Sequence, residues 1–126
     1  MQLSKQGVDE HIEQEMLDNF LQIIADIRTP QEAHLFLSGL LTDVELITFI
    51  KRIAIVQRLN QGDSYDAIRD LLKVSSATIA TMQSRSNHEG ILLALKKIEA
   101  DKWAEKWTKR ILDLLGFRNS TGALNP

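Results

Sequence analysis

The side chains best suited to chemistry lie between positions 64 and 85, and the chemistry they suit is contact with a polyanion. The stretch SYDAIRDLLKVSSATIATMQSR combines basic side chains with hydroxyls and small residues. Guanidinium and ammonium groups bind phosphate, while hydroxyls hydrogen-bond to phosphate oxygens or to base edges. The candidate contacts to DNA are Arg69, Lys73, Ser75, Ser76, Ala77, Thr78, Ala80, Thr81 and Arg85.

Catalytic chemistry has little support in the sequence. The chain has no cysteine, which excludes a thiolate nucleophile, a disulfide framework and a cysteine metal site. It has no glycine-rich phosphate loop, and none of its three histidines lies near a Ser–Asp or carboxylate pair by local spacing. His11 and Glu15 have the i,i+4 spacing of two metal ligands but no third ligand beside them. We therefore expect no enzymatic activity, no cofactor and no metal.

Charge is distributed unevenly along the chain, although the net charge is only −2. Residues 1–50 carry two basic and nine acidic side chains, whereas residues 51–97 carry eight basic and four acidic ones. Residues 98–126 carry five basic and four acidic side chains. A basic middle beside an acidic flank is typical of a soluble protein with one DNA-facing surface. The alternative is an ordinary set of solvated helix faces.

Helical periodicity dominates the chain, and Pro occurs only at positions 30 and 126. Capping residues mark helix starts: Thr29 precedes Pro30, Thr42 is followed by Glu45 in a capping box, and Ser64 and Ser75 precede two short segments. The sequence predicts an all-α fold with helices over 8–27, 30–38, 43–61, 65–72, 76–84 and 88–115, three of them ended by Gly39, Gly62 and Gly116.

Residues 64–84 have the plan of a helix-turn-helix, because two short capped helices are joined by about three residues. Apolar side chains lie where two crossing helices must interlock. This set is Ile68, Leu72, Val74, Ile79 and Met82. The spacing leaves small and hydroxyl side chains on the outer face of the second helix, which allows close approach to a major groove.

The predicted helix 43–61 is apolar on nearly every side, so it should be buried on every side. A chain of 126 residues struggles to surround one helix completely, which predicts a partner chain. The broad apolar stripe on helix 8–27 points the same way. Trp103 and Trp107, one turn apart, are interpreted as a stripe that docks the last helix, with a ligand platform as the alternative.

The runs LLTDVELITFIKR (40–52) and GDSYDAIRDLLKVSSATIA (62–80) resemble the Trp repressor family. The likeness covers about residues 40–82 in sequence, and most of the chain in helix order. It implies a six-helix fold and an intertwined homodimer whose first three helices and last helix form a shared core. It also implies that the two short helices form the DNA-reading head, with the second of them in the major groove.

The sequence departs from this family at the corepressor pocket, which holds the tryptophan indole between two arginines. Arg52 matches the first arginine, but Thr81 stands at the second position, too short to stack on a ring or to bind a carboxylate. Tryptophan binding is therefore not expected. Thr42 and Arg52 remain the candidates for a pocket with an unknown effector, and Arg52 is alternatively an ion-pair partner. Lys73 stands where such turns usually place Gly, at a penalty of roughly 1 kcal/mol.

Two functions remain open. The first is a sequence-specific DNA-binding regulator, a repressor that acts as a homodimer on a palindromic operator. The second is an all-helical protein-interaction module with a degenerate helix-turn-helix, which Lys73, Thr81 and the mild net charge favour. Salt-dependent binding to duplex DNA separates the two.

For the organisation of the chain we expect a single domain over 1–115 and a flexible tail over 116–126. The first ten residues lack the apolar core of a signal peptide, and no apolar run is long enough to span a bilayer. We therefore expect a cytoplasmic protein without a membrane partner.

Overall fold

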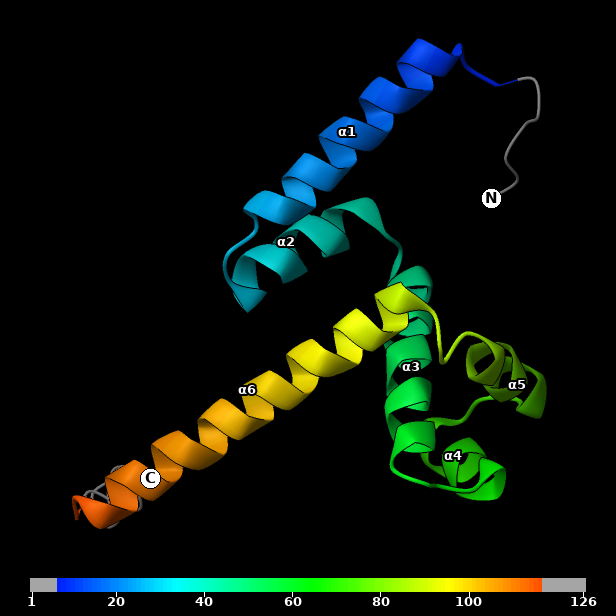
Figure 1. Cartoon of the computed structure of the whole chain (residues 1–126). Coiled ribbons are helices and arrows are strands. Elements are labelled where there is room, and N and C mark those ends of the chain that lie inside the picture. Colours follow the sequence, from blue (N-terminus) through cyan, green and yellow to red (C-terminus); the bar gives the residue numbers. More distant parts are fainter. Residues whose placement is uncertain (1–6, 117–126) are drawn as a thin grey trace. The chain divides into compact units, whose positions relative to one another are not determined.

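The computed structural model describes residues 7–116, which form six helices and no strand (Figure 1). The all-α prediction is confirmed. The predicted tail lies outside the described residues except for Gly116. The helices are α1 (Glu10–Asp26), α2 (Pro30–Leu40), α3 (Asp43–Asn60), α4 (Tyr65–Leu72), α5 (Ser76–Ser84) and α6 (Glu89–Leu114).

Several helix boundaries differ from the predicted ones by one or two residues. α1 begins at Glu10 rather than at residue 8, because the side chain of Asp9 accepts a hydrogen bond from the His11 N–H at 2.8 Å and caps the helix. α2 runs through Gly39 to Leu40, so Gly39 does not end it. α6 begins one residue later and ends one residue earlier than the predicted 88–115. Gly62 and Gly116 do end their helices, with φ of 88° and 81°.

The chain divides into two compact units, residues 1–47 and 48–126, which are described separately. In the first unit, α1 and α2 are joined by three residues, and Thr29 caps α2 by accepting a hydrogen bond from the Glu32 N–H at 3.1 Å. Phe20 of α1 meets Phe36 of α2 edge to face, with ring centroids 6.0 Å apart. No described residue of this unit is buried. The single domain over 1–115 stays a prediction.

The second unit has a small hydrophobic core to which α3, α4 and α5 each contribute. Its buried side chains are Ile55, Val56, Ile68, Ile79 and Met82. Around them pack the partly buried side chains Leu59, Tyr65, Leu72, Val74, Ile91 and Leu95. All five side chains expected to interlock the short helices belong to this cluster, so that prediction is confirmed.

The single chain leaves much of α3 uncovered. Only Ile55 and Val56 are buried, whereas Val44 is 73% exposed and Phe49 and Ile50 are about half exposed. The sequence predicted burial on every side together with a partner chain, because a chain of this size does not cover such a helix by itself. The exposure of these side chains in the single chain leaves that prediction open.

The docking of α6 also differs from the expectation. Ile91 and Leu95 pack against the core, whereas Trp103 is 63% and Trp107 43% exposed. The two indoles contact each other instead, with centroids 5.7 Å apart, and the Arg110 guanidinium lies 5.7 Å from the Trp107 ring. Residues advance by about 100° along a helix, so Trp107 lies roughly half a turn away from the core-facing side. The indoles therefore do not dock α6 on this unit.

Candidate nucleic-acid interface

α4 and α5 are the two short helices of the predicted motif, and each begins at a serine. The Ser64 hydroxyl accepts a hydrogen bond from the Ala67 N–H at 3.1 Å, and the Ser75 hydroxyl accepts one from the Thr78 N–H at 3.1 Å. These bonds satisfy N–H groups that have no partner within the helix. The two helices pack on each other through Ile68 and Ile79, both fully buried. A helix-turn-helix over 64–84 is therefore present as predicted.

The turn between α4 and α5 passes through Lys73 in the left-handed conformation, with φ 55° and ψ 54°. It is the one non-glycine residue among residues 7–116 with a positive φ. Its N–H donates to the Arg69 carbonyl at 2.9 Å, and its carbonyl accepts from the Lys51 ammonium of α3 at 3.5 Å. The turn thus has the geometry usually taken by glycine, and its carbonyl is tied to α3.

The outer face of α5 carries small side chains directly opposite the buried ones. Ile79 and Met82 face the core, and Ala77, Ala80 and Thr81 are exposed on the other side of the helix. Ser84, also exposed, continues this face at position i+7 from Ala77. It was absent from the candidates named from sequence, although its helical register places it there.

Two polar bridges connect α4 to α5 at opposite ends of the pair. The Tyr65 hydroxyl donates to the Gln83 side-chain oxygen, near the start of α4 and the end of α5. Arg69 donates to the Ser76 hydroxyl at 2.9 Å and pairs with Asp66. Such bridges fix the angle of α5 on α4, which decides where the outer face of α5 points.

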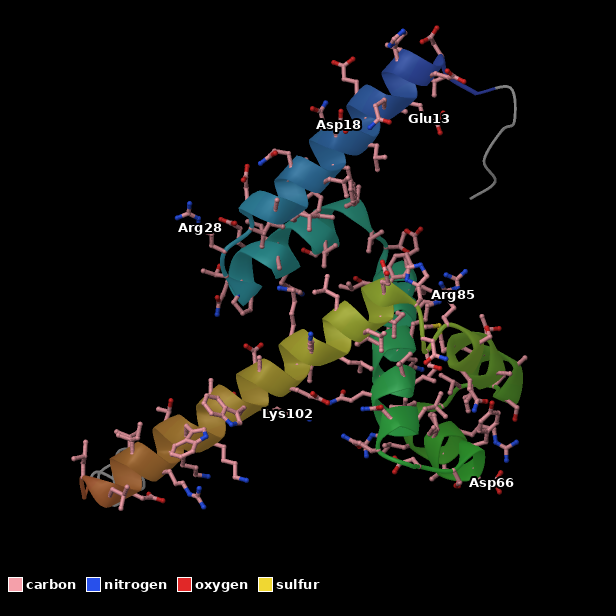
Figure 2. All side chains as sticks on the ribbon, in the orientation of Figure 1. Glu13, Asp18, Arg28, Asp66, Arg85 and Lys102 are labelled. Atoms are coloured by element: carbon pink, nitrogen blue, oxygen red, sulfur yellow. The ribbon has the colours of Figure 1, made fainter. Side chains whose placement is uncertain are left out.

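The nine candidate DNA contacts all lie on α4, α5 and the turns beside them. Figure 2 labels one of them, Arg85, which follows α5. Ser76 and Thr78 are half-buried, and the other seven are exposed. The hydroxyls of Ser75, Ser76 and Thr78 have hydrogen-bond partners inside the motif, since Ser75 lies 2.9 Å from the Thr78 hydroxyl. Lys73 and Arg85, by contrast, present their side chains to solvent.

The two candidate effector residues, Thr42 and Arg52, differ in their interactions with the rest of the chain. Thr42 and Glu45 form the predicted capping box: the Glu45 N–H donates to the Thr42 hydroxyl at 3.1 Å, and the Thr42 N–H donates to the Glu45 carboxylate at 2.9 Å. The backbone N–H of Thr42 is the larger cause, and the Thr42 side chain the second, that holds the pKa of the Glu45 carboxyl below its ordinary value. Arg52 is exposed and makes no ion pair within residues 7–116, contrary to one interpretation of it.

A cavity of about 390 Å³ lies beside the motif, lined among others by Leu59, Tyr65, Gln83 and Asn87. Neither Arg52 nor Thr42 lines it. Within residues 7–116, no cluster of three or more His, Asp or Glu side chains has a geometry for holding a metal ion. None of the helices in that range is long and apolar enough to cross a membrane.

The comparisons with known proteins give one match. The family model described as Trp repressor protein matches residues 15–89, which is more than half of the chain and includes α2 to α5 in full. No curated protein and no solved structure matches the chain.

Proposed function

The chain belongs to the Trp repressor family, and on that premise we propose that it is a DNA-binding transcription regulator, a repressor that acts as a homodimer on a palindromic operator. The observation that carries the proposal is the outer face of α5. Ala77, Ala80 and Thr81 are exposed on the side of α5 opposite the buried Ile79 and Met82. The helix therefore has a face of small side chains and is anchored to the core by its other face. A helix with such a face can lie deep in a major groove.

The charges around this face support binding to phosphate. Lys73 ends α4 and Arg85 follows α5, so a cation stands at each end of the reading helix. Both side chains are exposed. Cations at both ends of a groove-lying helix suit the two phosphate backbones that border the groove. The remaining basic side chain, Arg69, already pairs with Asp66 and Ser76 inside the motif.

The homodimer is supported by the surface that one chain leaves exposed. Large apolar side chains of α1 and of the first half of α3 are about half exposed, among them Ile12, Met16 and Phe49. Apolar helix faces left open to water are typical of surfaces that bind a partner chain. A second copy would cover them, and light scattering at micromolar concentration should give about twice the chain mass.

We also propose that free tryptophan is not the effector. Thr81 is exposed on α5, and its hydroxyl donates to the Ala77 carbonyl at 3.0 Å. A short, internally bonded hydroxyl offers neither a plane to stack on an indole nor a charge for a carboxylate. Any effector of this chain therefore needs chemistry other than the two-arginine clamp.

Ala77→Glu tests the DNA proposal directly. The added carboxylate would stand on the groove-facing side of α5, against phosphates and base acceptors, and should abolish binding to duplex DNA. Ala77 is exposed, so the fold should be retained, as circular dichroism and light scattering can show. Ala25→Glu, the same change on an exposed position of α1, is the matched control and should bind as the parent does.

The outcome also decides between the two functions left open by the sequence. If Ala77→Glu binds duplex DNA as tightly as the parent, α5 is not the reading helix. If the parent itself shows no salt-dependent binding to any duplex, the protein-interaction module becomes the better hypothesis.

A further inference from the structure

The second half of α6, from Ala100 to Leu114, carries an apolar stripe that the core of its own unit does not use. The partly buried residues of α6 are Ile91, Ala94, Leu95 and Ile98, and every later residue of the helix is exposed. Trp107 lies nine positions after Ile98, which turns it by about 180° away from the core-facing side. The stripe is therefore a separate surface. It consists of Ala100, Trp103, Trp107, Ile111 and Leu114.

α1 carries a second uncovered apolar face, and its charge is opposite to that of α6. Ile12, Met16 and Ile23 are each about half exposed, and Phe20, which contacts Phe36 of α2, is 36% exposed. α1 contains five acidic residues and no Lys or Arg. Residues 96–110 of α6 contain six basic and three acidic residues. Two amphipathic helices of opposite charge are suited to pack on each other.

We propose that the Ala100–Leu114 stripe of α6 packs antiparallel on α1 of a second copy of this chain. The spacing of the two stripes agrees when one of them is reversed. Ile12, Met16, Phe20 and Ile23 are separated by four, four and three positions, and so are Ile111, Trp107, Trp103 and Ala100. The lengths also agree, since 17 residues of α1 and 15 of α6 span about 25 and 22 Å.

The proposal rests on the proposed homodimer and names two surfaces that would form part of it. The family match ends at Glu89 and does not cover residues 90–114. In a two-fold dimer the contact occurs twice, α1 on the partner's α6 and the partner's α1 on α6. Each contact would bury on the order of 800 Å², so that two reach the standard interface size of about 1,600 Å².

Disulfide trapping in the full chain tests the register, because the chain has no cysteine of its own. In Ile23→Cys/Ala100→Cys, the alignment sets the two thiols level across the contact, so mild oxidation should give a covalent dimer of about twice the chain mass. Ala25→Cys/Ala100→Cys is the matched control, because residue 25 lies two positions from 23 and about 160° around α1. It should remain at the mass of a single chain under the same oxidation.

Three results would overturn the proposal. These are no disulfide in the first variant, a bond within one chain, or equally fast cross-linking of the control. Trapping needs no DNA, and duplex binding by the reduced variants is measured separately. A chain that binds DNA without cross-linking would refute only the α1–α6 contact, and one that cross-links without binding DNA would refute only the DNA-binding function.

Discussion

Replacing Lys73 separates the backbone geometry of the turn from the charge it carries. Lys73 adopts φ 55° and ψ 54°, where a side chain clashes with its own backbone at a cost of roughly 1–2 kcal/mol. Glycine adopts this conformation freely but loses about 0.5–1 kcal/mol through the greater freedom of the unfolded chain. Lys73→Gly should therefore raise the free energy of unfolding by about 0.5–1 kcal/mol.

Lys73→Ala is the matched control, because it removes the ammonium group and keeps the strained Cβ. It should leave the free energy of unfolding within about 0.5 kcal/mol of the parent value. The Lys51–Lys73 hydrogen bond uses the backbone carbonyl, so both variants keep it. Urea titrations at one fixed protein concentration measure the differences, because the stability of a dimer depends on concentration.

Duplex binding should respond differently from stability. Both variants lack the exposed ammonium at the end of α4, so both should bind DNA more weakly. The slope of log K against log salt should fall by about one unit in each, as expected for one lost phosphate contact. Equal stability of Lys73→Gly and Lys73→Ala would refute the argument from strain, and an unchanged slope would refute the phosphate contact.

Three further predictions follow from the structure. Ile79→Ala should lower the free energy of unfolding by about 2–5 kcal/mol, since Ile79 is fully buried, whereas Leu71→Ala, at a half-exposed position of α4, should cost far less in the same urea titration. Glu45 should titrate below its ordinary pKa in an NMR pH series, and in Thr42→Val its pKa should rise only part of the way back, because valine removes the hydroxyl but keeps the backbone N–H that is the larger cause of the shift. The folded form favours the carboxylate, so the stabilisation is present above the unfolded pKa and is lost as the pH falls through the folded one. Calorimetric titration with L-tryptophan should give no heat of binding, and micromolar affinity would contradict the argument from Thr81.

The elements of this fold could be predicted from sequence because their signals are local. Ser64 and Ser75 mark the starts of α4 and α5, and the spacing of Ile68, Ile79 and Met82 identifies the sides that meet. A cap or a periodic stripe acts within one or two helical turns, so it can be read without knowing the rest of the molecule. The helix-turn-helix could be predicted from sequence for the same reason.

Local signals could not predict which neighbouring helix packs on each apolar helix face. Trp103 and Trp107 were expected to dock α6, but Ile91 and Leu95 do so. Periodicity shows that a helix has an apolar side without showing which neighbour covers it, and α6 has two such sides on opposite faces. Ser76 stays a predicted DNA contact, but the hydrogen bond that its hydroxyl accepts from Arg69 could not be predicted either. A pairing across seven positions depends on the angle between two helices, which no local pattern encodes.

The two parts of the proposed function, DNA binding and dimerisation, are connected by the packing of α5 on the core of its unit. Operator spacing depends on where a dimer holds its two reading helices, which must lie about 34 Å apart to enter successive major grooves on one side of a duplex. In each chain the buried side chains of α5 share a core with Ile55 and Val56 of α3, and the first half of α3 carries exposed apolar side chains. The α3 helix thus carries the reading head at one end and offers an apolar surface for a partner at the other. Any change of partner packing along α3 would then alter the separation of the two α5 helices, and with it the choice of operator.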